Sequence, residues 1–117
     1  MCEVWIIDDS ENYLELCAGF LNDEGYKVRT FLNGGDAVNS LNSNSHPRVM
    51  LVDASIKPQG GRALIGDLRK AGYQNRIIAQ SANGIFAEKL KDVADVTLQK
   101  GDAEELRISI KSLASLL

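Results

Sequence analysis

The sequence lacks the features that mark membrane, secreted and nucleic-acid-binding proteins. Its longest apolar runs, such as Val4–Ile7 and Val49–Val52, fall far short of the roughly 20 residues that a membrane-spanning helix needs. The first residues reach two aspartates at once, without the cationic start and long apolar stretch of a signal peptide. The 13 Lys and Arg against 16 Asp and Glu give a net charge of −3, so no general basic field attracts nucleic acid. We therefore expect a cytoplasmic protein that binds neither a membrane nor, directly, a nucleic acid.

Soft metal ligands and nucleotide-binding loops are scarce as well. Cys2 and Cys17 form no CxxC pair and have no histidine nearby, so we expect buried, reduced thiols. The single histidine, His46, lies in a polar loop without a second ligand, and we assign it no role. The glycine pairs at 34–35 and 60–61 match neither a GxGxxG nor a Walker pattern, which leaves them as turn glycines.

What the chain does contain is an ordinary globular composition. It has 117 residues, of which 44% are hydrophobic and 25% charged. This length is close to the commonest domain size and suffices for a proper core. The balance excludes a disordered tail, a collagen-like rod and a small disulfide scaffold. We expect residues 1–117 to form one domain.

Five strand-like apolar runs alternate along the chain with five helix-like stretches. The strand-like runs are 3–7, 26–31, 48–52, 76–80 and 96–99. The helix-like stretches follow Ser10, Gly35 and Gly61, cover 85–93, and follow Asp102, where Glu105 completes a capping-box-like start. Parallel strands need helical crossovers, so this alternation predicts an α/β fold with a doubly wound parallel sheet. In such sheets ligands bind beyond the carboxyl ends of the strands.

The residues at those strand ends carry the chemistry of the predicted site. Asp8 and Asp9 follow the first strand, Asp53 the third, Ser81 the fourth and Lys100 the fifth. Two like charges ~4 Å apart repel by about 4 kcal/mol at an effective dielectric near 20, so three clustered carboxylates call for a cation. An all-oxygen ligand set without histidine or cysteine suits Mg²⁺ better than zinc. We therefore expect Mg²⁺ at this edge of the sheet.

A carboxylate beside a phosphate-binding metal can act as a nucleophile on phosphorus and form an acyl phosphate. Asp53 is the candidate nucleophile. Lys100 and the Ser81 hydroxyl would bind the remaining phosphoryl oxygens and stabilise their charge. Taken singly, these residues have ordinary structural alternatives, such as a cap for Ser81 or a solvated cation for Lys100. Their joint placement at the strand ends favours the shared site.

Four segments together resemble the receiver domains of bacterial two-component response regulators. The segments are Ile-Ile-Asp8-Asp9, Leu-Val-Asp53, Ala-Gln-Ser81-Ala82 and Leu-Gln-Lys100, and the resemblance covers essentially the whole chain. It implies a flavodoxin-like fold of five parallel strands in the order 2-1-3-4-5 with five helices. It also implies that the backbone carbonyl of Ser55 joins the three aspartates as a ligand of Mg²⁺.

The resemblance further implies a role in phosphorelay signal transduction. A sensor histidine kinase or phosphotransfer protein would donate the phosphoryl group to Asp53, and the domain would catalyse its own phosphorylation and slow dephosphorylation rather than act as a metabolic enzyme. Ser81 would move toward the phosphate on activation. A downstream effector protein or domain would read the phosphorylated state, and a homodimer is compatible with this reading.

The chain departs from the family pattern in four places. Thr97 stands where the family usually has the aromatic residue of its switch, and Gly101 follows the lysine where a cis proline is typical. Pro58 is displaced by one residue in the loop after the acceptor, although Gly61 falls where the family has glycine. The interval from Ser81 to Lys100 is a few residues short, which predicts a trimmed fourth helix.

Two other functions fit parts of the pattern. A pseudo-receiver would keep the fold and dock partners without phosphoryl transfer, and Thr97, Gly101 and the shortened interval before Lys100 favour it. An aspartyl phosphohydrolase acting on a small metabolite fits less well, because 117 residues leave no room for a cap domain. Ile108 and Leu116 lie off the main apolar stripe of the last helix, either as part of a partner face or as scattered surface residues.

Overall fold

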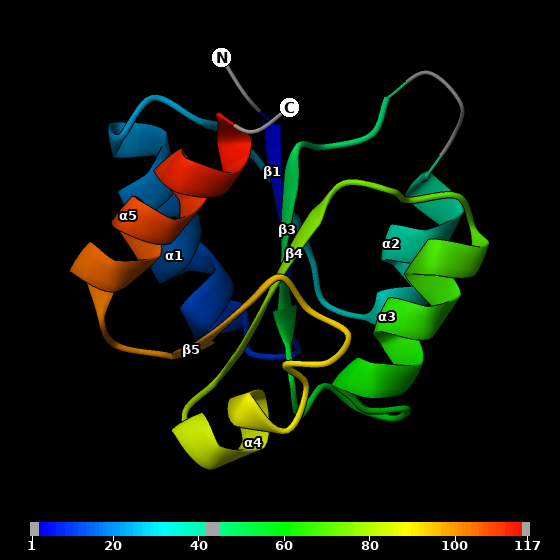
Figure 1. Cartoon of the computed structure of the whole chain (residues 1–117). Helices are drawn as coiled ribbons and strands as arrows, with labels where there is room; N and C mark the ends of the chain where they lie inside the picture. Colours follow the sequence, from blue (N-terminus) through cyan, green and yellow to red (C-terminus); the bar gives the residue numbers. More distant parts are fainter. Residues whose placement is uncertain (1–2, 42–44, 116–117) are drawn as a thin grey trace.

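The computed structural model describes residues 3–41 and 45–115, which form a five-stranded parallel sheet between two layers of helices (Figure 1). The strands are β1 (Glu3–Ile7), β2 (Lys27–Phe31), β3 (Val49–Asp53), β4 (Arg76–Ser81) and β5 (Val96–Gln99). The helices are α1 (Glu11–Asp23), α2 (Gly34–Ser40), α3 (Gly61–Lys70), α4 (Gly84–Glu88) and α5 (Ala103–Ala114). The strand order is β2-β1-β3-β4-β5, which confirms the expected fold class.

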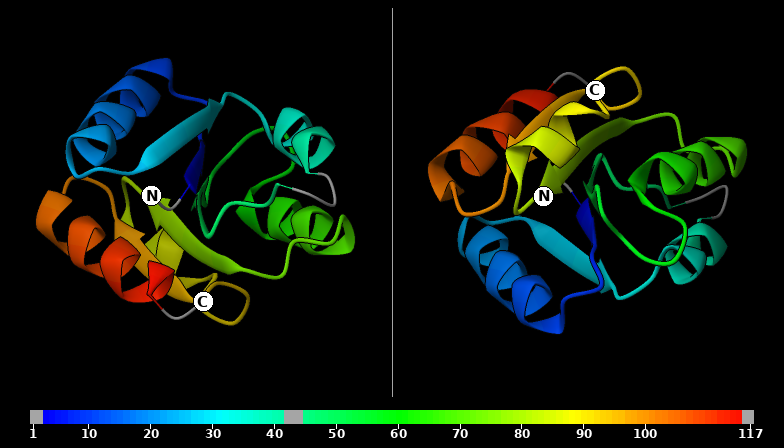
Figure 2. Two further views of the ribbon diagram at one scale, coloured as in Figure 1. Left: turned by 90° about the horizontal axis from the view of Figure 1, so that it is seen from above. Right: turned by 90° about the horizontal axis from the view of Figure 1, so that it is seen from below.

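Both faces of the sheet are covered by helices, which explains why the central strands read as continuous apolar runs. Helices α1 and α5 lie on one face, and α2 and α3 lie on the other (Figures 1 and 2). Side chains alternate between the two faces along each strand. In β1, Val4 and Ile6 pack with residues of α1 and α5, whereas Trp5 and Ile7 pack on the α2 and α3 side.

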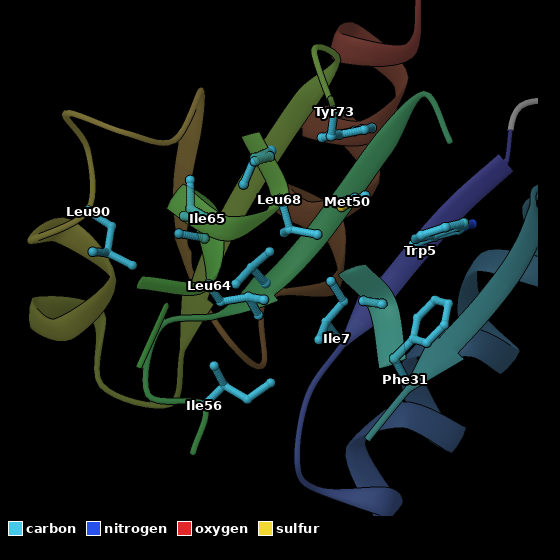
Figure 3. Packing of buried hydrophobic residues seen from close by; sticks show 14 residues of the cluster. Trp5, Ile7, Phe31, Met50, Ile56, Leu64, Ile65, Leu68, Tyr73 and Leu90 are labelled. Carbon is cyan, nitrogen blue, oxygen red and sulfur yellow. The ribbon is translucent and has the colours of Figure 1, made fainter. Parts of the chain in front are cut away.

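The larger of the two cores fills the space between the sheet and the α2–α3 layer (Figure 3). The rings of Trp5 and Phe31 meet at a centroid distance of 4.9 Å, and Leu64 and Leu68 bring the apolar side of α3 onto the strands. Full burial of one such side chain stabilises the fold by about 1.5–3 kcal/mol. This rigid core fixes the height at which each strand ends, and thereby the position of the polar residues that follow.

Helix boundaries follow the signals in the sequence. The Ser10 hydroxyl accepts a hydrogen bond from Tyr13 N at the start of α1, and Asp102 Oδ1 accepts one from Glu105 N at the start of α5. Beyond the end of α1, Gly25 takes a φ of 95°, a left-handed conformation that glycine adopts without steric cost. The predicted caps are therefore confirmed.

The fourth helix differs from the expected 85–93 stretch. Regular α-helix ends at Glu88, and the chain then closes tighter turns in which Leu90 N donates to Ala87 O and Val93 N to Leu90 O. The short interval before β5 forces this compaction, while Leu90 packs against the α2–α3 core. The length of the predicted helix was wrong, and the expectation of a trimmed helix is confirmed.

Expectations about surface residues, cysteines and membrane helices can also be compared with the structure. Ile108 is exposed on α5 and Cys17 is buried on α1, as predicted. Cys2, Leu116 and Leu117 lie outside the described residues. None of the helices formed by the described residues has the length and apolar character that crossing a bilayer requires.

Candidate functional site

The polar residues after β1, β3, β4 and β5 meet at the carboxyl edge of the sheet because the strands are in staggered parallel register. Ile7 pairs with Val52, which places Asp8 level with Asp53. Asp53 in turn pairs with Gln80, the residue before Ser81. The backbone ladder continues one step further, with Lys100 N donating to Ser81 O at 2.8 Å. Figure 2 (right) looks onto this edge.

Side-chain alternation sorts these residues between the two faces of the sheet. Ile6, Leu51, Ile78 and Leu98 pack on the α1–α5 side. Asp8, Asp53, Gln80 and Lys100 each stand two positions further along their strands, so alternation turns them toward the same face. Ser81 falls on the opposite phase. The strand pattern thus brings two carboxylates and the lysine together and separates the hydroxyl from them.

Three carboxylates form a cluster at this edge. One oxygen from each of Asp8, Asp9 and Asp53 lies within 4.8 Å of the others. Asp8 is fully buried, Asp53 is 5% exposed, and Asp9 is open to solvent. This cluster, called the acidic pocket below, is therefore closed to solvent at Asp8 and open to it at Asp9.

Each of these carboxylates is held by a backbone N–H from the loop that follows a strand. Ser10 N donates to Asp8 Oδ1 at 2.9 Å, and Ser55 N donates to Asp53 Oδ1 at 3.1 Å. Lys57 N donates to Asp9 Oδ2 at 3.2 Å and so joins the loops after β1 and β3. Such local bonds fix the carboxylates in place before any ligand arrives.

The loop after Asp53 makes a close approach to α3 that only glycine allows. A Cβ on Gly61 would lie 2.8 Å from the Cα of Ala54, and Gly61 N donates to Ala54 O at 3.0 Å. A larger residue here would push the loop that carries Ser55 away from the acidic cluster. The glycine expected at position 61 thus has a direct steric reason.

Lys100 supplies the single cation that lies against this cluster in the described part of the chain. Its Nζ lies 2.5 Å from Asp8 Oδ2 and 3.6 Å from Asp53 Oδ1. The side chain of Lys100 is only 16% exposed. The lysine expected to reach phosphoryl oxygens is therefore in the pocket, and its nearest partner is Asp8.

Burial raises the pKa of the Asp53 carboxyl, and the negative charges of Asp8 and Asp9 raise it further. The Ser55 N–H and the Lys100 ammonium act in the opposite direction without cancelling the effect. Three carboxylates against one ammonium leave an excess of negative charge. An oxygen-only cluster of this size and charge fits a hard divalent cation such as Mg²⁺.

Ser81 lies at the site's edge and has a structural partner of its own. Ser81 is 3% exposed, and its hydroxyl accepts a hydrogen bond from Asn83 N at 3.2 Å. This bond caps the turn that leads into α4. The N-cap of α4 is Asn83, whose Oδ1 accepts from Ile85 N at 2.9 Å, so the alternative in which Ser81 caps this helix was wrong. Because the Ser81 oxygen is the acceptor in its bond with Asn83 N, its own O–H can still donate to another group.

The departures from the receiver pattern have a visible structural form. At the position where the family usually has an aromatic residue, Thr97 Oγ1 donates a long hydrogen bond of 3.4 Å to Glu88 Oε2 at the end of α4. Gly101 has a φ of 102° after a trans peptide, and among the described residues the cis peptide is Lys57–Pro58. The loop after Lys100 is therefore shaped differently from a cis-proline loop, as expected.

Sequence reasoning missed two residues beside the pocket. Tyr13 places its ring centroid 4.5 Å from Lys100 Nζ, and its hydroxyl donates to Gln80 Oε1 at 3.0 Å. Two signals were available in the sequence. Tyr13 stands one helical turn after Asp9, and Gln80 interrupts an apolar strand run with an amide.

Known proteins share both the sequence pattern and the fold. The sequence model of the family described as the response regulator receiver domain matches residues 4–111. Sensor histidine kinase RcsC of Escherichia coli (strain K12) is 30% identical over 86 residues, which is 74% of this chain and 9% of that protein. The chain thus spans about a tenth of the length of this curated relative.

Two solved structures superimpose over nearly the whole chain. One is response regulator protein TrrA from Thermotoga maritima in complex with Mg²⁺–BeF, with 27% identity, 97% and 99% coverage of the two chains and a TM-score of 0.85. Another is the receiver domain of the Francisella response regulator 1452, with 25% identity, 98% coverage of both chains and a TM-score of 0.83.

Proposed function

The chain belongs to the response regulator receiver domain family of two-component signalling, and we propose that its phosphoacceptor is Asp53, charged by a partner histidine kinase or phosphotransfer protein. The observation that carries this proposal is the acidic cluster, in which Asp8, Asp9 and Asp53 meet at the carboxyl edge of the sheet beside Lys100. In a receiver, this signalling role is distinct from that of a metabolic enzyme.

Asp53 suits the nucleophile's role better than either of its neighbours. Asp8 is fully buried beneath the pocket and paired with Lys100. Asp9 is exposed at the rim and tied to Lys57 N. Asp53 is intermediate in burial. Of its two carboxylate oxygens, only Oδ1 accepts a hydrogen bond from the described residues. The Oδ2 oxygen is therefore the one available for attack.

The proposed step forms one bond and breaks one. A carboxylate oxygen of Asp53 attacks phosphorus, the bond from phosphorus to the donor's histidine nitrogen breaks, and the electron pair of that bond leaves with the nitrogen. The product is an acyl phosphate on Asp53. The nucleophile in this step is the ionised carboxylate of Asp53.

Asp8, Asp9, Asp53 and the Ser55 carbonyl are the residues that would hold Mg²⁺, which supplies positive charge to the incoming phosphoryl oxygens. Lys100 lies within reach of Asp53 and would bind a further oxygen of the group. The Ser81 hydroxyl, which accepts from Asn83 N, would donate its own proton to another phosphoryl oxygen. A downstream effector protein or domain would then read the altered β4–α4 loop.

Phosphorylation without a kinase tests the proposal most directly. The protein is incubated with Mg²⁺ and acetyl phosphate, and its intact mass is measured. We expect a mass increase of one phosphoryl group that disappears on omission of Mg²⁺ and in Asp53→Asn. Asp23→Asn, an exposed carboxylate at the end of α1, serves as the matched control and should be phosphorylated normally.

Two outcomes would overturn the assignment. An adduct that survives Asp53→Asn would place the acceptor elsewhere. Absence of any adduct in the wild-type protein, with the fold and Mg²⁺ binding intact, would leave the pseudo-receiver, which docks partners without phosphoryl transfer. Because the donor is a small molecule, a positive result would also establish that the domain catalyses its own phosphorylation.

A further inference from the structure

The ring of Tyr13 packs against the lysine of the acidic pocket. The distance from Lys100 Nζ to the ring centroid is 4.5 Å, well within the range of a cation–π interaction. Tyr13 lies in the first turn of α1, where its backbone N–H is bound by the Ser10 hydroxyl at 3.3 Å. Lys100 is thus surrounded by two carboxylates and one aromatic face, contributed by three different elements.

The Tyr13 side chain is also held by a hydrogen bond to the sheet. Its hydroxyl donates to Gln80 Oε1 at 3.0 Å, and Gln80 on β4 is only 2% exposed. A glutamine on a central strand has little freedom to move, since its backbone is fixed by pairing with both β3 and β5. The hydrogen bond therefore holds the ring at a fixed distance from the sheet and from Lys100.

The ion pairs with Asp8 and Asp53 attract the ammonium of Lys100, but they do not by themselves fix the path of its side chain. Its four-carbon stem has several rotatable bonds, and its ammonium is strongly hydrated. Tyr13 and Lys100 both line a cavity of about 180 Å³ between α1 and the start of α5. The other walls of this cavity include the apolar side chains of Leu16, Phe20 and Leu106. The ring face stabilises the ammonium on the pocket's side of this space.

We propose that Tyr13 is a positioning residue for Lys100, whose ammonium it holds where the phosphoryl group on Asp53 will need it. The inference rests on the proposed function of Asp53 and Lys100. The ring does the positioning, and the hydroxyl acts only through Gln80. Removal of the ring and removal of the hydroxyl therefore have different consequences.

Three variants separate these contributions. Tyr13→Leu removes the ring, and Tyr13→Phe keeps the ring but leaves the buried Gln80 Oε1 without its donor. Phe20→Leu is the matched control, because it removes a ring from the same helix and the same cavity. In the described part of the chain, Phe20 makes no cation–π contact with Lys100.

The first measurement is the rate of Asp53 phosphorylation over a range of acetyl phosphate concentrations. We expect Tyr13→Leu to lower the maximal rate about fivefold, the size expected of one partly buried cation–π contact, with little change in the half-saturating concentration. Tyr13→Phe should keep the maximal rate within about twofold while melting at a lower temperature. Phe20→Leu should leave the rate unchanged.

The second measurement does not depend on phosphorylation. In metal-free protein labelled with ¹³C-lysine, the aromatic ring should shift the NMR signals of the Lys100 Cε protons upfield in the wild type and in Tyr13→Phe, and the shift should vanish in Tyr13→Leu. A wild-type protein with this shift but without phosphorylation would overturn the proposed function and leave the contact established.

Two results would overturn the positioning role itself. One is a Tyr13→Leu variant that is phosphorylated at the wild-type maximal rate. The other is an equal loss of rate in Phe20→Leu, which would mean that the effect comes from general packing of α1 rather than from the contact with Lys100.

Discussion

The two edges of the sheet use charged residues in opposite ways. At the amino edge, where the strands begin, Arg69 and Arg76 meet Asp95. At the carboxyl edge, three carboxylates cluster, and Lys100 pairs with Asp8 and Asp53. Both edges are partly buried, and both bring together residues that are far apart in the sequence. They differ in whether the donors and acceptors find enough partners within the chain.

The amino edge pairs most of its charged groups within the chain, although the buried Nε of Arg76 has no hydrogen-bond partner among the described residues. Arg69 Nη1 donates to the backbone oxygens of Tyr73 and Asn75, at 3.0 and 2.7 Å, so this guanidinium closes the turn between α3 and β4. Asp95 Oδ2 accepts a hydrogen bond from Ile77 N at 2.8 Å, while Arg76 lies 3.3 Å from its Oδ1. Such a network stabilises the fold and leaves little for a ligand to satisfy.

The carboxyl edge keeps an excess of negative charge that the chain does not balance. Each aspartate accepts one backbone N–H, and in the described part of the chain one ammonium, that of Lys100, pairs with two of the three. A domain with a net stability of 5–15 kcal/mol tolerates such repulsion only in a small region. The difference between the edges teaches that charge left unbalanced by the fold is what marks the binding site.

The largest expected effect comes from removal of Lys100, the cation that pairs with the acidic cluster at the carboxyl edge. Lys100→Met leaves Asp8 fully buried and without its ion-pair partner. We expect the free energy of unfolding, measured with urea in metal-free buffer, to fall by about 3 kcal/mol. Saturating Mg²⁺ should recover much of this loss, because the metal binds only the folded state. Lys111→Met on α5 is the control, and its exposed side chain should contribute little.

If Lys100→Met were as stable as the control in metal-free buffer, the ion pair with Asp8 would not be holding the edge together. If Mg²⁺ failed to stabilise either protein, the carboxylates would not form a metal site, and the comparison between the edges would fail at its most important point.

The same Asp-to-Asn change should have opposite signs at the two edges. Asp53→Asn removes a charge from a repelling set, and we expect it to stabilise the metal-free protein by about 1 kcal/mol. Asp95→Asn removes the charge that two guanidinium groups share, and we expect a loss of about 2 kcal/mol. Melting temperatures in EDTA measure both. A destabilised Asp53→Asn, or an indifferent Asp95→Asn, would remove the contrast.

The pH dependence of stability sharpens the same point. The pKa of Asp53 is raised in the folded protein above its ordinary value of 3.8, so ionisation of this residue opposes folding. As pH rises from 3.8 through the raised pKa, the wild type should lose stability relative to Asp53→Asn, and the difference should then stay constant. Urea titrations of both proteins without metal measure it. A difference that is the same at every pH would show that repulsion at Asp53 is not its source.

Much of the site could be predicted because its residues directly follow apolar runs that are recognisable as strands in the sequence. The apolar run before Asp8 and the one before Asp53 stop at charged residues, and the parallel register brings those ends level. The cap at Asp102 was likewise readable, since it depends on a few neighbouring residues, whereas the close approach of Gly61 to Ala54 was not predicted. Periodicity and turn chemistry carry this information directly.

The remainder depends on how separate elements pack in three dimensions. The contact between Tyr13 and Lys100 requires a particular placement of α1 beside β5, which no periodicity specifies. The lysine's preference for Asp8 over Asp53 follows from side-chain geometry at the end of β5. The early end of α4 reflects the space available before β5. Sequence reasoning missed Tyr13 and could only place Lys100 near the aspartates.

The smallest effect belongs to an ion pair that lies at neither edge. Arg62 and Asp92 are bonded at 2.8 Å between α3 and the turn after α4, yet both side chains are more than half exposed. The pKa of Asp92 is lowered by hydrogen bonding to Arg62, but solvent and salt screen such a pair. Arg62→Gln should therefore melt within error of the wild type at moderate ionic strength. A clear loss of stability there would mean that exposed pairs also matter in this fold, and that burial is not what separates the two edges from the rest of the surface.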